Sequence, residues 1–229
     1  MRAPAKLTLS LRILGRRPDG YHLIDAEMVA LDLCDELVFD EGDRLEVTGA
    51  SGLEVPDGDD NLVRRALSAV GRTAHVRLLK RIPSGAGLGG GSADAAAVLR
   101  WAGCTDLELA VGIGADVPFC LVGGRARVGG IGEVVEPLPA RPQVFTLLTP
   151  PFGVPTAAVY SAWDDLGGPR AEGPNDLEPA ALAVEPRLAG WRDHLAEATG
   201  QAPVLAGSGS SWFVEGAHPG DDRVVVHTL

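Results

Sequence analysis

A glycine-rich stretch at residues 80–92, KRIPSGAGLGGGS, constrains this chain more than any other feature of its sequence. Before it, residues 74–79 alternate apolar and polar side chains, which is the period of a strand with one buried face. Pro83 ends that strand, and five glycines follow within seven residues. An alanine-rich run comes next, so we expect strand, glycine loop and helix in that order. Ser92 is predicted to cap the helix, with Asp94 in its first turn.

A loop of this kind predicts an anion site. Glycine lets backbone N–H groups approach a ligand closely, and the start of a helix adds a partial positive charge. We therefore expect a polyphosphate here, with a flexible loop as the simpler alternative. The loop does not end in Gly-Lys-Ser/Thr, so it is not a Walker A loop, and the protein-kinase motifs His-Arg-Asp and Asp-Phe-Gly do not occur in the sequence.

Composition narrows the class of protein. The chain has 229 residues, 45% of them hydrophobic, and a formal net charge of −11. That charge argues against a nucleic acid or an anionic membrane as partner. The sequence contains no apolar run of membrane-spanning length, and its three cysteines are expected to be buried thiols of a cytoplasmic protein. We expect a small-molecule substrate, and the sequence leaves the oligomeric state open.

The amino-terminal segment predicts a strand followed by a tight turn. Residues 7–13 alternate leucine or isoleucine with polar residues, and Lys6 shares the parity of Thr8 on the opposite face. The turn at residues 16–20 is followed directly by Tyr21 and His22. By themselves these side chains indicate a solvated lysine and ordinary packing.

Four motifs resemble those of the GHMP small-molecule kinases, which include galactose, homoserine and mevalonate kinases. The loop at 83–92 resembles their second motif, and residues 3–7 (APAKL) resemble their first. Residues 114–119 (GADVPF) resemble the segment with the catalytic aspartate, and residues 207–211 (GSGSS) resemble the third motif. The resemblance implies an α+β, two-lobed GHMP kinase-like fold, with a nucleotide-binding domain over 1–142 and a smaller carboxy-terminal domain over 143–229.

Further segments resemble one branch of this family. They are residues 15–22 (GRRPDGYH), 31–37 (LDLCDEL), 129–133 (GGIGE) and 175–179 (NDLEP). Members of that branch phosphorylate a cytidine diphosphate-linked branched polyol in isoprenoid precursor synthesis. The resemblance implies phosphoryl transfer from ATP, with Mg²⁺, to the 2-hydroxyl of a cytidine diphosphate-linked methylerythritol. Two alternatives stay open: another GHMP kinase with a different alcohol, and a non-catalytic nucleotide-binding relative.

The resemblance also assigns roles to residues. Asp116 would be the general base that takes the proton of the alcohol, and Lys6 would stabilise the developing alkoxide; without the resemblance, Asp116 is an ordinary turn residue. Metal ligands are left undetermined, with Ser92 or Asp94 as possible contacts. The residues expected to bind ATP are Asn61, Lys80, Pro83, Ser84, Gly85, Ala86, Gly87, Leu88, Gly89, Gly90, Gly91 and Ser92.

Substrate binding is expected from both halves of the chain. In the branch the Tyr-His pair frames the cytosine, with Tyr160 stacked opposite Tyr21. The loop that starts at Gly207 should press on the first glycine loop, although a simple β-turn is the alternative there. The residues expected to bind substrate are Thr8, Tyr21, His22, Thr156, Tyr160, Gly207, Ser208 and Gly209.

Three departures from the branch are visible. Thr8 stands where the branch usually has asparagine, and Ser210-Ser211 replaces the usual Ala-Cys. The chain is also short in its helical segments. Periodicity predicts strands near 24–31, 36–40, 44–48, 124–128, 143–149, 203–206, 212–215 and 223–227, and helices near 61–71, 92–103, 106–113, 155–163, 176–183 and 186–199.

Overall fold

The computed structural model describes residues 1–49, 58 and 60–229, and it contains two sheets. The first has the strand order β3-β4-β2-β5-β6, with β1 paired to β2; the second has the order β10-β7-β9-β8. The strands of the first sheet are β1 (Arg2–Arg16), β2 (His22–Asp40), β3 (Arg44–Gly49), β4 (His75–Lys80), β5 (Arg125–Gly130) and β6 (Val134–Pro137). Those of the second are β7 (Val144–Leu148), β8 (Val204–Leu205), β9 (Trp212–Glu215) and β10 (Arg223–His227).

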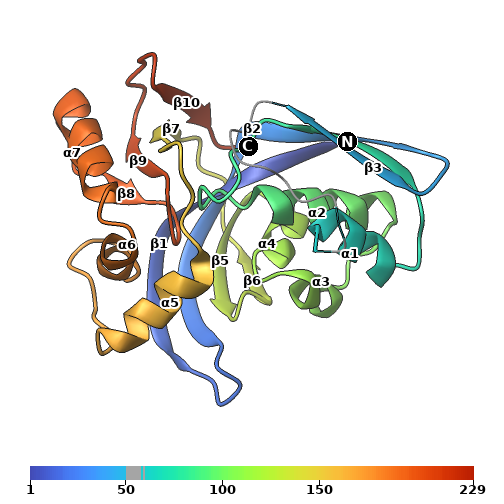
Figure 1. Ribbon diagram of the computed structural model, residues 1–229, viewed down its shortest axis with the longest axis horizontal. Coiled ribbons are helices and arrows are strands. Elements are labelled where there is room, and N and C mark those ends of the chain that lie inside the picture. Colours follow the sequence, from blue (N-terminus) through green and yellow to red (C-terminus); the bar gives the residue numbers. More distant parts are fainter. Residues whose placement is uncertain (50–57, 59) are drawn as a thin grey trace.

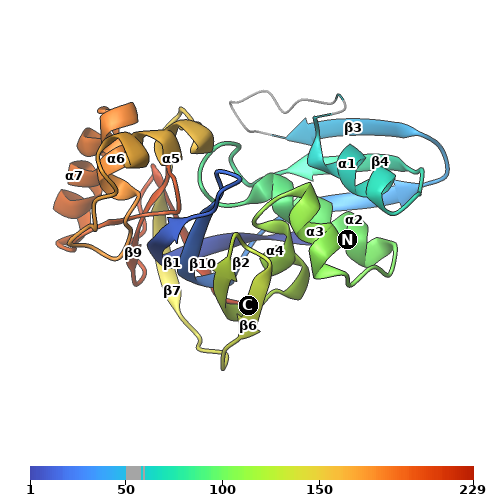
Figure 2. The same cartoon turned by 90° about the horizontal axis from the view of Figure 1, so that it is seen from below.

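Helices fall into two groups, one beside each sheet (Figure 1). The first group is α1 (Leu62–Ala69), α2 (Gly90–Trp101), α3 (Leu107–Ile113) and α4 (Val117–Val122). The second group is α5 (Thr156–Asp165), α6 (Glu178–Val184) and α7 (Leu188–Thr199). Helix α2 lies at the centre of the first group, and its residues 93–99 are all buried. Figure 2 shows the two groups of helices at opposite ends of the molecule.

The two sheets meet through the end of the chain. The backbone N–H of Leu229 donates to the Ala30 carbonyl oxygen at 3.0 Å, and the His227 N–H donates to the Asp32 carboxylate at 2.9 Å. Strand β10 therefore lies beside β2, and the second sheet is anchored to the first (Figure 1). Within the part of the chain that the structure describes, none of the helices combines the length and the apolar character that crossing a bilayer requires.

The predicted α+β class is confirmed, and most predicted elements are present. Two separate strands were expected at 24–31 and 36–40, but β2 is one continuous strand of 19 residues. It continues because it pairs with β5 over its first half and with β4 over its second half, while β1 spans the junction. The short elements α4 and β6 were not predicted, since each has too few residues to show a period.

Candidate active site

A cavity of about 890 Å³ lies between the two groups of helices, and this volume suits a small-molecule site. Its wall contains every predicted site residue except Leu88, which is only 1% exposed within the core. The structure thus brings together residues from the first strand, the glycine loop, α5 and the second glycine loop. The predicted residues in the wall are Lys6, Thr8, Tyr21, His22, Asn61, Lys80, Pro83, Ser84, Gly85, Ala86, Gly87, Gly89, Gly90, Gly91, Ser92, Asp116, Thr156, Tyr160, Gly207, Ser208 and Gly209.

The glycine loop leads directly into α2, as predicted, but the helix starts earlier than expected. Its N-cap is Gly89, in a left-handed conformation with φ of 67°, and this residue has no side chain to cap the helix. The prediction that Ser92 is the cap is therefore wrong, and Asp94 lies beyond the first turn. A Cβ at Gly89 would lie 2.7 Å from the Cγ of Lys6, and the left-handed conformation also disfavours a side chain, so only glycine fits here. Residues 89–92 at this helix start all line the cavity.

The two glycine-rich loops are in direct contact, as expected. The N–H of Ser211 donates to the Ala86 carbonyl oxygen at 3.1 Å, and a Cβ at Gly87 would overlap the carbonyl oxygen of Ala206. Gly87 has a φ of 77°, so both its conformation and its surroundings require glycine. The second loop does contain a β-turn, because the Gly209 N–H donates to the Ala206 carbonyl oxygen at 2.9 Å, and that turn packs directly on the first loop.

Asn175 is a residue of this region whose role the sequence did not indicate. Its Nδ2 donates to the carbonyl oxygens of Leu205 and Gly207, at 2.8 and 2.7 Å, and its Oδ1 accepts from the Leu177 N–H. The side chain is fully buried. It therefore fixes the second loop against α6, and the motif at 175–179 was the available signal.

Lys6 and Asp116 lie next to each other at the junction of the loops. Nζ of Lys6 is 3.4 Å from Oδ2 of Asp116 and donates to Oγ1 of Thr8 at 3.0 Å. Lys6 is 4% exposed, whereas a third of the Asp116 side chain is exposed toward the cavity. A Cβ at Gly207 would lie 3.1 Å from Nζ, so the ammonium also touches the second loop. A buried cation beside an open carboxylate is suited to deprotonating a bound alcohol.

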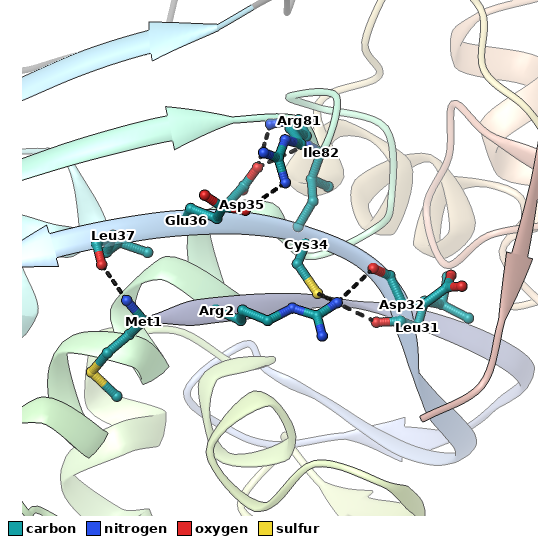
Figure 3. A network of polar contacts seen from close by, with 10 residues as sticks. All are labelled: Met1, Arg2, Leu31, Asp32, Cys34, Asp35, Glu36, Leu37, Arg81 and Ile82. Atoms are coloured by element: carbon teal, nitrogen blue, oxygen red, sulfur yellow. Dashed lines mark hydrogen bonds and ion pairs between the residues drawn. The ribbon is translucent and has the colours of Figure 1, made fainter.

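A buried ionic triad lies beneath the start of α2. Lys80 forms ion pairs with Asp35 and, at 2.8 Å, with Asp94, and none of the three is more than 3% exposed. Asp35 also accepts hydrogen bonds from the backbone N–H groups of Arg81 and Ile82, which lead into the glycine loop (Figure 3). The predicted nucleotide residue Lys80 therefore lines the cavity with its charge already paired.

The triad has one more carboxylate than ammonium. Burial, opposed by the charge of Lys80, raises the pKa of Asp94 to about 7. Its Oδ1 atom has no hydrogen-bond partner among the described residues. A pKa near 7 leaves this carboxyl group partly protonated at neutral pH, because burial disfavours its charge and Lys80 is shared with the second carboxylate, Asp35.

The far end of the cavity is aromatic. The rings of His22 and Tyr160 pack with their centroids 4.8 Å apart, and the rings of His22 and Trp163 are nearly perpendicular with their centroids 5.6 Å apart. Burial raises the pKa of the Tyr160 hydroxyl, which stays neutral. Tyr21 is 58% exposed and borders the same space, so a flat ring could be contacted from more than one side.

Asp164 is a second residue that sequence reasoning missed. Its carboxylate accepts from Nε2 of His22 at 2.8 Å and pairs with Nη1 of Arg16 at 3.2 Å. At the other end of α5, Oγ1 of Thr156 lies 2.9 Å from Oγ of Ser208. Helix α5 thus joins the β1–β2 hairpin to the second glycine loop.

Comparison with known proteins identifies the family of this chain. The GHMP kinases N terminal domain matches residues 61–124. The 4-diphosphocytidyl-2-C-methyl-D-erythritol kinase of Paramagnetospirillum magneticum is 37% identical, over 92% of this chain and 86% of its own length. The enzyme of the same name from Pelotomaculum thermopropionicum is 40% identical with the same coverage of both chains.

Solved structures give the same result. A crystal structure of 4-(cytidine 5'-diphospho)-2C-methyl-D-erythritol kinase matches with a TM-score of 0.76 and 32% identity, over 99% of this chain and 98% of that one. The mevalonate kinase of Methanococcus jannaschii, at 11% identity and a TM-score of 0.56 over 100% and 98% of the two chains, shares the fold alone. On the sequence relatives and this structure together, the chain belongs to the GHMP kinases and, within them, to the 4-diphosphocytidyl-2-C-methyl-D-erythritol kinase family.

Proposed function

We propose that this protein transfers the γ-phosphoryl group of ATP to the 2-hydroxyl of 4-diphosphocytidyl-2-C-methyl-D-erythritol, a step of isoprenoid precursor synthesis. The observation that carries the proposal is the position of the Lys6–Asp116 pair, 3.4 Å apart, where the glycine loop meets the second loop. The family relationship supports the choice of substrate, and the aromatic end of the cavity is suited to a cytosine ring.

Phosphoryl transfer depends mainly on positioning and on neutralising charge. The backbone amides at 85–92 and the start of α2 supply a site for the phosphates of ATP. Because Gly87 packs directly on Ala206, the second loop keeps this backbone in one position. The triad below adds rigidity through the Arg81 and Ile82 amides.

The acceptor hydroxyl loses its proton as the new bond to phosphorus forms. In our proposal Asp116 accepts that proton, and the Lys6 ammonium stabilises the oxygen as negative charge develops. Thr8 accepts a hydrogen bond from Lys6 and so limits the directions in which the ammonium can point. The side chain of Asp116 is the more exposed of the pair, as a base that meets the substrate has to be.

The donor set of the cavity fits a magnesium ion held mostly by phosphate oxygens. No cluster of three or more ligating side chains occurs among the described residues, and Mg²⁺ in kinases typically uses only one or two protein oxygens. The Ser92 hydroxyl in the cavity wall would hold the ion, with Asp94 less suited because it is paired with Lys80. When bound, the ion would neutralise charge on the transferred group.

A coupled assay of ADP release tests the proposal. The purified protein is given ATP and Mg²⁺ with the cytidine compound, mevalonate or homoserine in parallel. We expect turnover with the cytidine compound only. Turnover with another alcohol would reassign the substrate, and nucleotide binding without turnover would support a non-catalytic relative. The cytoplasmic location stays a prediction from the sequence.

A further inference from the structure

The contact between Asp164 and His22 fixes the position of a proton. A carboxylate accepts hydrogen bonds and donates none, so the 2.8 Å contact requires a proton on Nε2 of His22. Nη1 of Arg16 forms an ion pair with the other oxygen of Asp164 at 3.2 Å, and the guanidinium favours the ionised carboxylate. In the neutral imidazole, Nδ1 is then an acceptor.

That second ring nitrogen has no partner in the described chain. No hydrogen bond from a described residue reaches Nδ1 of His22, and the residue lines the cavity. The ring itself packs against the rings of Tyr160 and Trp163, with centroid distances of 4.8 and 5.6 Å. In this tautomer Nδ1 can therefore accept a hydrogen bond from a donor group of a molecule bound in the cavity.

We propose that Asp164 is a specificity-determining positioning residue, which holds the His22 proton on Nε2 so that Nδ1 accepts a hydrogen bond from the 4-amino group of cytosine. The inference rests on the proposed function and deepens it. Cytosine carries an amino donor at position 4, whereas uracil carries a carbonyl acceptor there. The same His22 tautomer therefore favours a cytidine diphosphate group and rejects a uridine diphosphate group.

The substitution Asp164→Asn should reverse this arrangement. Arg16 can only donate, so it takes the amide oxygen of the new side chain and leaves the NH₂ group facing His22. Nε2 must then accept, the proton moves to Nδ1, and the ring becomes a donor toward the base. The matched control is Asp165→Asn, which removes the same charge from the next position of α5, where the side chain is exposed and forms no ion pair with the described residues.

The test compares cytidine diphosphate-methylerythritol with its uridine counterpart at pH 8. We expect Asp164→Asn to lower kcat/KM for the cytidine compound about tenfold or more, mainly through KM. The reason is that Nδ1 of His22, now a donor, would face the amino donor of cytosine. The value for the uridine compound should stay unchanged or rise. Asp165→Asn should leave the ratio of kcat/KM for the cytidine compound to kcat/KM for the uridine compound at its wild-type value.

A binding measurement separates this inference from the proposed reaction. Calorimetry with CDP and UDP reports base preference without turnover, and the expected wild-type preference for CDP should disappear in Asp164→Asn. Absence of turnover by the wild type, with that preference intact, overturns only the reaction. Equal losses for both bases, or equal binding of CDP and UDP by the wild type, overturn the role of Asp164. If thermal unfolding shows that Asp164→Asn does not fold, Asp164→Ala provides the comparison. Alanine removes the acceptor of the Nε2 proton, so His22 is no longer held in one tautomer. The ratio of the affinities for CDP and UDP should then approach one.

Discussion

Nζ of Lys6 lies 3.4 Å from Oδ2 of Asp116, although the two residues come from the first strand and from the start of α4. Lys6 is buried between the two glycine-rich loops, and Asp116 is open to the cavity. The pair therefore connects the phosphate-binding region to the space where an alcohol would sit. It is the arrangement on which the proposed reaction depends.

Replacement of Asp116 by asparagine should lower turnover roughly 10²-fold or more, because the amide cannot accept the proton of the alcohol. The binding of ATP should be retained, since the glycine loop and α2 do not depend on this side chain. Steady-state kinetics and a nucleotide titration measure the two effects. Turnover at the wild-type rate would remove Asp116 from the mechanism.

Gly87→Ala should disrupt the contact between the loops. An added Cβ would overlap the Ala206 carbonyl oxygen, and the φ of 77° is unfavourable for alanine. Gly103→Ala is the matched control, because its φ is 73° and nothing lies within 4 Å of an added Cβ. Both variants should lose about 1 kcal/mol to backbone strain, but only Gly87→Ala should also weaken ATP binding. Urea unfolding and nucleotide titration check this pair, and equal effects at both positions would contradict it.

Asp94→Asn should change how stability depends on pH. The raised pKa of about 7 means that the folded state keeps a proton that the unfolded chain, with an ordinary value of 3.8, has already released. In the wild type this group therefore lowers the free energy of unfolding as pH rises from about 4 to 7, by about 1.4 kcal/mol per pH unit at most. The variant lacks the titration, so its stability relative to the wild type should rise over this window. Urea unfolding at several pH values measures the difference, and a constant difference would refute the shared-charge account of the triad.

Tyr21→Ala should weaken binding of CDP by about 1–3 kcal/mol, the usual loss when an aromatic ring no longer stacks on a base. Because Tyr21 is 58% exposed, the free energy of unfolding should change by only about 0.5 kcal/mol. Calorimetry and urea unfolding separate the two effects. A large loss of stability with unchanged CDP binding would show that the ring serves packing instead.

The sequence by itself determined the local order of the chain. Alternation before residue 80 predicts the strand, the glycines at 85–91 predict the loop, and the alanine-rich run predicts the helix. These signals can be found in the sequence because each depends on neighbouring residues only. Motif order likewise indicated the family, and the proximity of the two glycine loops was expected from it.

Only the tertiary structure decided which distant groups meet. The structure places the helix cap at Gly89 and not at Ser92, and the Lys6 side chain fills the space beside that glycine. The pairing of Lys80 with Asp35 and Asp94, and that of His22 with Asp164, joins residues far apart in the sequence. Such contacts depend on how strands and helices pack, and no local period or spacing records them.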